Sequence, residues 1–231
     1  MLIRAVLLLA MGFGADGAAA HDPQLPAEDL FFEERSETRR FTWTIDPLLA
    51  RYPDIVRALR AESLPESRLS EDNCVEPMPC YRLVRHERGF AGERLVSIFT
   101  EQEGYYGGAH GGSSAEHRIW DRKEGRWIPF GDLFRSWPEA QALLQQRFCA
   151  NLNEMREDEV ECASLDELAL GFHEGSELPV GMRAGAFEFR TSDYQLGSYA
   201  QGRVNIRVAI DEAILALIRP EYRADFAAAD Y

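Results

Sequence analysis

The strand-like segments of this sequence fall into two blocks, and this grouping constrains the fold more than any other feature. Within each block, most neighbouring segments are separated by short stretches that contain glycine, which favours antiparallel hairpins. A parallel sheet would instead need a helix after almost every strand. The pattern therefore predicts an α+β fold, with a mainly antiparallel sheet and packed helices. The expected strands are residues 81–86, 94–100, 115–121 and 126–130 in the first block, and 187–190, 194–196 and 204–208 in the second.

Three segments show the spacing of helices. Residues 47–61 carry apolar side chains at helical intervals, and Pro53 favours a fresh helix start within them. Residues 137–155 carry one apolar stripe: Ala140, Leu144, Phe148, Leu152 and Met155. A third helix is expected after Asp211, whose side chain suits an N-cap. A strand over 40–45, the first helix and a polar loop at 62–79 together predict a small N-terminal strand–helix unit.

The first twenty residues have the three parts of a secretory signal peptide. Arg4 supplies the positive charge, residues 5–12 are apolar, and Ala18–Ala20 supply small residues for cleavage. The alternative, an uncleaved anchor, is disfavoured because a membrane span needs about 20 apolar residues. No later stretch is apolar enough to span a bilayer. We therefore expect a mature chain that starts at His21, has no stable membrane span, and is periplasmic or secreted.

The chain is strongly acidic. Its 39 Asp and Glu residues against 25 Lys and Arg residues give a formal net charge of −14, which argues against a protein that binds nucleic acid through phosphate contacts. Residues 154–177 concentrate this charge and include Glu157, Asp158 and Glu159. Two explanations stay open: a solvated acidic face, or a field that steers a cationic partner. Lys123 is the only lysine, a skew typical of a GC-rich genome, and we assign it no function.

Export makes disulfide bonds the expected state of the four cysteines. Pairing each with its nearest neighbour joins Cys74 to Cys80 and Cys149 to Cys162, and closes two local loops. Four cysteines allow three pairings, so this remains one of three. A redox-active pair is disfavoured because the chain has no Cys-x-x-Cys, and the spacings do not match zinc knuckles.

The densest local signal is a glycine-rich stretch with two tyrosines and a histidine, at residues 105–114. Four glycines in six positions allow backbone conformations and close approaches that other residues forbid. The tyrosines offer flat amphipathic surfaces to a sugar or a peptide. A tight connection between strands, with a packed histidine, is the structural alternative. The candidate binding residues are Tyr105, Tyr106, Gly107, Gly108, His110 and Gly111.

Enzyme chemistry finds weaker support. His110-Gly-Gly is similar to the oxyanion loop of lipases and Ser113 lies nearby, but the chain has no Gly-x-Ser-x-Gly elbow. His86, His110, His117 and His173 lack the spacing of a zinc site. Carboxylate pairs are abundant, and none is singled out for glycoside hydrolysis. We therefore nominate no catalytic residue, no metal ligand and no cofactor.

The same residues resemble a bacterial envelope domain family of unknown function. Its signature is a Gly-Gly-Ala-His loop, a Thr-Gly-Lys-like turn and an Asp-Leu-Phe helix start. This chain has Tyr-Gly-Gly-Ala-His-Gly at 106–111, a Lys-Glu-Gly turn at 123–125 and Ile-Pro-Phe-Gly-Asp-Leu-Phe at 128–134. The closing pattern is matched at Phe187–Phe189, Tyr199–Gly202 and the final helix. Residues 41–64 resemble the smaller companion domain that often precedes it. The resemblance spans residues 41–226.

Relatives in this family include the extracellular part of a lysozyme-binding anti-sigma factor and the non-catalytic part of a peptidoglycan deacetylase. This chain lacks the spanning helix of the first and the metal-dependent domain of the second. The resemblance implies a non-enzymatic binding module for a cell-wall glycan or a cationic, lysozyme-like hydrolase. The alternatives are an enzyme acting on peptidoglycan or another glycan, and a purely structural envelope protein. The expected regions are a signal peptide (1–20), an acidic arm (21–37), the companion unit (38–100), the envelope domain (101–226) and a tail (227–231).

Overall fold

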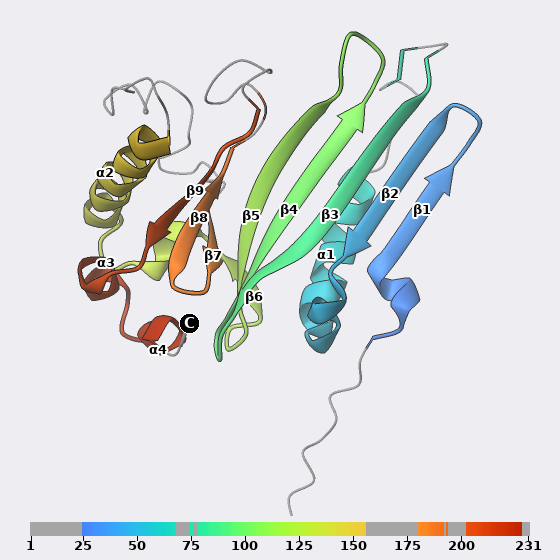
Figure 1. The fold of residues 1–231 in the computed structure, drawn as a ribbon. Coiled ribbons are helices and arrows are strands. Elements are labelled where there is room, and N and C mark those ends of the chain that lie inside the picture. The colour runs from blue at the N-terminus through green and yellow to red at the C-terminus, as the bar shows by residue number, and fades with distance from the viewer. Residues whose placement is uncertain are drawn as a thin grey trace, which may run out of the picture.

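The computed structural model describes residues 25–67, 74–75, 78–155, 180–191, 193 and 202–227. Within them the chain forms a six-stranded sheet in the order β1-β2-β3-β4-β5-β6 and a three-stranded sheet in the order β7-β8-β9 (Figure 1). All neighbouring strands are antiparallel except β2 and β3, which run parallel. The predicted α+β fold with a mainly antiparallel sheet is confirmed.

The six-stranded sheet consists of β1 (Phe31–Arg35), β2 (Arg39–Ile45), β3 (Cys80–Ala91), β4 (Leu95–Tyr105), β5 (Gly112–Asp121) and β6 (Arg126–Ile128). The smaller sheet consists of β7 (Val180–Arg183), β8 (Ala186–Arg190) and β9 (Asn205–Ala209). The helices are α1 (Pro53–Ser67), α2 (Trp137–Met155), α3 (Glu212–Leu217) and α4 (Arg223–Ala227), with 3-10 turns η1 (Ala27–Leu30), η2 (Pro47–Arg51) and η4 (Phe130–Leu133). No helix in these described ranges is both long and apolar enough to cross a membrane.

The parallel pair β2–β3 requires a crossover, which η2 and α1 supply. The Asp46 carboxylate starts η2 by accepting a hydrogen bond from the Leu48 amide at 2.8 Å. Helix α1 begins at Pro53, as predicted, but continues to Ser67 instead of ending at 61. It continues because Leu64 extends its apolar face and is only 9% exposed. Residues 62–67, which were expected in a polar loop, are therefore helical.

The crossover covers one face of the large sheet and forms the first hydrophobic core. Strands β2, β3 and β4 contribute alternate side chains, as expected where a strand has one buried face. Trp43 and Leu59 are fully buried at its centre. The cluster consists of Phe41, Trp43, Ile45, Leu49, Ile55, Val56, Leu59, Leu64, Val84, Val96, Ile98 and Trp120.

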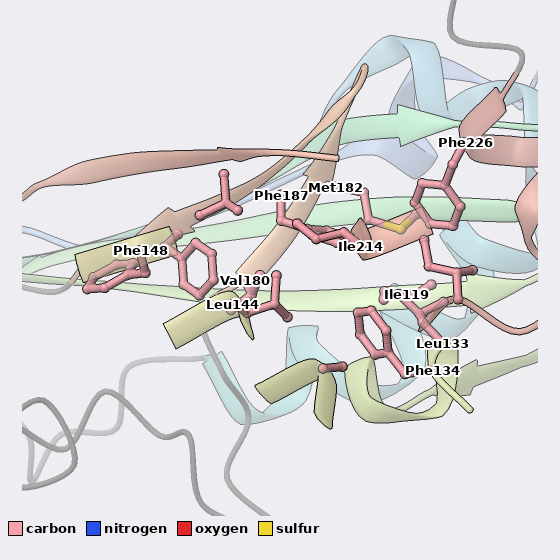
Figure 2. Close-up of a cluster of buried hydrophobic side chains, with 14 of the residues drawn as sticks. Ile119, Leu133, Phe134, Leu144, Phe148, Val180, Met182, Phe187, Ile214 and Phe226 are labelled. Atoms are coloured by element: carbon pink, nitrogen blue, oxygen red, sulfur yellow. The ribbon is translucent and has the colours of Figure 1, made fainter. Parts of the chain in front are cut away.

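The smaller sheet, α2, α3 and α4 form a second core with the opposite face (Figure 2). Strand β7 lies very close to β4. A Cβ on Gly181 would come within 1.9 Å of the Phe99 ring, and a Cβ on Gly89 would come within 2.6 Å of the Met182 carbonyl oxygen. The two glycines therefore set the spacing of the layers. Asp211 caps α3 as predicted, accepting from the Ile214 amide at 3.0 Å.

Several segments differ from expectation. Part of the expected acidic arm, residues 31–35, is strand β1, which pairs with β2. Strand β7 was not predicted, and the strand expected at 194–196 lies outside the described residues. Residue 100, where one unit was expected to end, falls inside β4, and one sheet runs through both sides of it. Met155, expected on the buried stripe of α2, is 61% exposed because it is the last residue of that helix.

Candidate functional site

The glycine-rich stretch forms the connection between β4 and β5, at one end of the large sheet (Figure 1). Gly107 and Gly108 have φ angles of 94° and 124°, which side chains rarely allow. A Cβ on Gly111 would meet the Gly104 carbonyl oxygen at 2.7 Å. The predicted need for glycine is therefore met by two positive φ angles and one close backbone approach.

Hydrogen bonds fix this loop internally. The Tyr105 hydroxyl donates to the Gly108 carbonyl at 2.9 Å, and His110 Nδ1 donates to the Gly111 carbonyl at 2.7 Å. The Tyr106 ring packs over Gly104, where a Cβ would lie 2.6 Å from the Tyr106 hydroxyl oxygen. His110 is exposed, so it is not the packed core histidine of the structural alternative.

The Cys74–Cys80 disulfide bond places a second segment against this loop. The Val75 amide donates to the Tyr106 carbonyl at 2.9 Å, and the Val75 side chain occupies the space that a Cβ on Gly107 would need. The first predicted cysteine pair is thereby confirmed. Cys149 is also disulfide-bonded, while its expected partner, Cys162, lies outside the described residues.

These two segments form what we call the sheet tip, residues 74–75, 78–81 and 105–111. Seven large hydrophobic side chains in the described ranges are exposed, and four of them lie here. Residues scattered singly would need no explanation, but grouped apolar side chains mark contact surfaces. The four are Val75 (61% exposed), Met78 (43%), Tyr81 (45%) and Tyr106 (37%).

The acidic stretch of residues 154–177 is described only at its first two residues. Glu157, Asp158 and Glu159 lie outside the described residues. Glu154, the first acid of that stretch, lies in the last turn of α2. The structure therefore brings the tyrosine, glycine and histidine candidates together at the sheet tip.

Two of the predicted histidines are buried on opposite faces of the sheet. His86 pairs in register with Thr100, whereas His117 pairs with Phe99, the preceding residue. His110 lies at the sheet tip, and His173 lies outside the described residues. The three described histidines are therefore not assembled around a common centre.

His86 belongs to a polar network in the α1 core. Ser63 Oγ donates to the Leu59 carbonyl and accepts from Trp43 Nε1, so His86 Nε2 must donate the third bond, at 3.0 Å. Its Nδ1 then accepts from the Thr100 hydroxyl at 2.8 Å. Burial, assisted by the charge of Arg118, lowers the pKa of His86 to about 3. The ring is neutral, and both of its nitrogens are already bonded.

His117 has a similar environment in the other core. Ser97 Oγ accepts from the Met182 amide at 3.0 Å and lies 2.8 Å from His117 Nε2. Burial lowers the pKa of His117 to about 3, and the nearby charges of Arg190 and Arg183 act in the same direction. This serine–histidine pair is closed to solvent, with Ser97 at 0% exposure. It anchors β7 and cannot serve as an accessible nucleophile.

Ser113, considered above as a nucleophile, is also engaged. Its amide and its hydroxyl both donate to Asp193 Oδ2 at 2.7 Å. His110 Nδ1 bonds to Gly111 instead. The Ser113 hydroxyl therefore donates to a carboxylate that also accepts from the Ser113 amide, and not to the histidine that a serine–histidine pair would require.

The opposite end of the large sheet carries a site that the sequence did not predict. We call it the hairpin-end cluster: Arg94, Asp121, Tyr222 and Asp225. The fully buried Asp121 accepts from Arg94 Nη2 at 2.7 Å and from the Tyr222 hydroxyl at 3.2 Å. Burial alone would raise the pKa of Asp121, but the bonds from Arg94 and two turn amides outweigh it and lower the pKa. Asp121 is therefore ionised at neutral pH and is unsuited to donate a proton.

Asp225 closes the turn between β3 and β4. Its carboxylate accepts from the amides of Glu93, Arg94 and Leu95, the last at 2.6 Å. Gly92 leaves room for it, since a Cβ there would lie 2.5 Å from the Asp225 Cγ. Asp121 precedes the Lys-Glu-Gly turn, and an aspartate there is a recognisable turn signal. No local sequence pattern indicates that Arg94 would pair with Asp121, or that Asp225 would bind the β3–β4 turn.

A cavity of about 670 Å³ opens beside the hairpin-end cluster. The start of α1, the β3–β4 turn, the β5–β6 turn and the segment around α4 each contribute lining residues. Both apolar and charged side chains of either sign face it. The residues are Tyr52, Asp54, Ile55, Glu93, Arg94, Trp120, Arg122, Lys123, Glu221, Ala224 and Asp225.

Comparison with known structures shows what the chain is similar to. No protein-family model matches the sequence, and no curated protein matches it. A DUF3298 family protein from Pseudomonas aeruginosa PAO1 superposes with a TM-score of 0.53 at 18% identity, covering 83% of this chain and 93% of that chain. A DUF3298 member from Bacteroides fragilis NCTC 9343 gives 0.53 at 16% identity, covering 80% and 73%. The fold is therefore similar to that of a family of domains of unknown function.

Proposed function

We propose that this chain is an exported, non-enzymatic binding module of the cell envelope, and that the sheet tip contacts its partner. The observation that carries the proposal is the group of exposed apolar side chains at the tip, held on a loop that is fixed by hydrogen bonds and a disulfide bond. Exposed apolar side chains on a fixed scaffold lose little conformational freedom on binding. The described histidines and Ser113 have structural partners instead of a catalytic arrangement.

The proposed partner is a cell-wall glycan or a wall-related protein, and a cationic hydrolase of the lysozyme kind is tested first. The resemblance of the glycine-rich loop to that of a lysozyme-binding envelope protein supports this choice. The net charge of −14 also supports it, because complementary charge raises association rates. Export through the signal at residues 1–20 would place the chain beside such partners.

Surface-binding kinetics with the mature chain, from residue 21 onward, test the proposal. Lysozyme should bind, and Tyr106→Ala combined with Tyr81→Ala should weaken binding about tenfold or more, as expected for aromatic anchors. Leu48→Ala is the matched control, since Leu48 is equally exposed (44%) and lies in η2, away from the tip. Neutralising Glu157, Asp158 and Glu159 should slow association more than it changes dissociation.

Two results would contradict the proposal. One is equal binding of an unrelated basic protein with the same net charge, which would reduce the effect to non-specific attraction. The other is unchanged binding of the double tyrosine variant, which would remove the sheet tip from the contact. Association that slows steeply between low and physiological salt is expected if the acidic stretch contributes.

A further inference from the structure

The cavity at the hairpin end lies at the opposite end of the sheet from the tip, and the proposed function does not use it. Its volume of about 670 Å³ falls within the range of small-molecule sites. Ile55 and Trp120 form an apolar floor and are 1% and 8% exposed. Tyr52 lines one side, and the Arg122 guanidinium lies 5.4 Å from its ring centroid.

The charged groups around this cavity fall into two kinds. Four are already engaged: Asp54 with Arg57, Arg94 with Asp121, Asp225 with turn amides, and Arg122 with the Glu93 carbonyl at 2.7 Å. The remaining three side chains, Lys123, Glu93 and Glu221, have no hydrogen-bond or ion-pair partner in the described part of the chain. Unpaired charges of both signs thus surround one cavity without neutralising each other.

We infer that this cavity binds a small zwitterion, an amino acid or short peptide with a free ammonium group, a free carboxylate and an apolar side chain. The Lys123 ammonium suits the carboxylate, and Glu93 and Glu221 suit the ammonium. The apolar side chain would pack against Tyr52 and the floor. The Lys123 ammonium is a compact charge on a flexible stem, so it can adjust to a carboxylate inside the cavity.

Calorimetric titration of the full mature chain tests this with five probes: the dipeptide Ala-Leu with both ends free, its N-acetylated form, its C-terminal amide, the doubly blocked form, and free leucine. The free dipeptide should bind at millimolar concentration or better. Blocking either end should weaken binding about tenfold, the loss of one charge-assisted contact. Comparison with leucine distinguishes a peptide from an amino acid as the ligand.

Variants then assign each charge. Lys123→Gln should weaken binding of the free and N-acetylated dipeptides about tenfold and leave the amide unaffected, whereas Lys123→Arg should retain part of the affinity. Glu221→Gln should affect only probes with a free ammonium group. Arg40→Gln and Glu139→Gln are matched controls outside the cavity. Each variant must keep the melting temperature of the parent chain, as expected for exposed side chains.

Equal binding of all four dipeptide forms would overturn the inference, and so would the absence of saturable binding by the free dipeptide. A Lys123→Gln effect that is the same for every probe would also overturn it. The tip proposal is tested separately, because the double tyrosine variant should leave dipeptide binding unchanged. Likewise, Lys123→Gln should leave lysozyme binding at the tip unchanged.

Discussion

The two ends of the large sheet are held in different ways. At the sheet tip, backbone carbonyls, one disulfide bond and two glycines with positive φ fix the loop, and apolar side chains face solvent. At the hairpin end, the buried carboxylates of Asp121 and Asp225 accept hydrogen bonds from turn amides, a guanidinium and a phenol, and the exposed side chains are charged. One end therefore presents apolar contacts, while the other presents charges around a cavity.

This difference shows that the two ends of the same strands contribute unequally to the stability of the fold. The tip is tied together by contacts within a short stretch and its disulfide partner segment. The hairpin end depends on α4, which is far away in sequence, because Asp225 caps the turn before β4. Damage at the hairpin end should therefore affect the whole fold, whereas damage at the tip should stay local.

The largest effect is expected at the hairpin end, from Asp121→Ala. It leaves the Arg94 guanidinium, which is only 17% exposed, without its buried partner. Such a loss costs about 3–5 kcal/mol in the free energy of unfolding. Urea denaturation measures it. Asp54→Ala is the control, because its ion pair with Arg57 is exposed and should contribute about 1 kcal/mol or less; equal losses would contradict the contrast.

The tip was largely predictable and the hairpin end was not, for a physical reason. The glycine-rich loop and the Cys74–Cys80 pair are local patterns, and their residues lie close together whatever the rest of the chain does. The helix over 137–155 has one apolar stripe and was predicted with its correct ends. The ion pair between Arg94 and Asp121, and the Asp225 cap, depend on how distant elements dock, which no local pattern records.

The missed strands have a similar explanation. β1 is acidic and exposed on most of its positions, so its composition indicated an arm instead of a strand. It forms because β2 offers an edge with which it can pair. β7 contains Gly181, which weakens any strand pattern, yet that glycine is required where the two sheets approach. In both cases tertiary contacts override the local preference.

Between the two ends, the buried His117 should make the free energy of unfolding depend on pH. In the unfolded chain the pKa of His117 is near 6.5, and burial lowers it to about 3 in the fold. Between these values the unfolded state binds the extra proton, so stability falls as pH falls from about 6.5 toward 3. The loss from this histidine should reach about 3 kcal/mol at pH 4. Urea titrations at pH 7 and pH 4 on the parent and on His117→Gln should differ by this amount.

His86 stays in both proteins and cancels from that comparison. Carboxylates such as Asp121, with its lowered pKa, also lose stabilising interactions in acid, but equally in both proteins. Identical pH dependence of the two proteins would show that His117 is protonated in the folded state or is not buried.

A smaller effect is expected where the two sheets meet. Gly181→Ala places a Cβ 1.9 Å from the Phe99 ring, and the overpacking should cost about 1–3 kcal/mol. Gly112→Ala is the matched change at the start of β5, where a Cβ would meet nothing within 4 Å. It should change stability by about 0.5 kcal/mol or less. The melting temperatures of the two variants measure this difference. An unchanged melting temperature for Gly181→Ala would mean that β7 can move away from Phe99 without a loss of stability.

The smallest effect is expected at the sheet tip. Gly108→Ala should cost about 1–2 kcal/mol through its positive φ alone, since its Cβ position is open. Gly107→Ala should cost more, because its Cβ would also lie 2.8 Å from the Val75 Cβ.

Adding Val75→Gly, which removes the contacting Cβ, to Gly107→Ala tests the difference between these two glycines. A double-mutant cycle should show recovery of part of the Gly107→Ala loss, because the two residues share one contact. The same cycle with Gly108 should show no coupling. Equal losses at the two glycines, with no recovery, would mean that the disulfide segment does not rest on the loop. The Val75 amide donates a hydrogen bond to the Tyr106 carbonyl. Lysozyme binding measured on the same variants would therefore show whether the contact between Val75 and Gly107 also positions Tyr106.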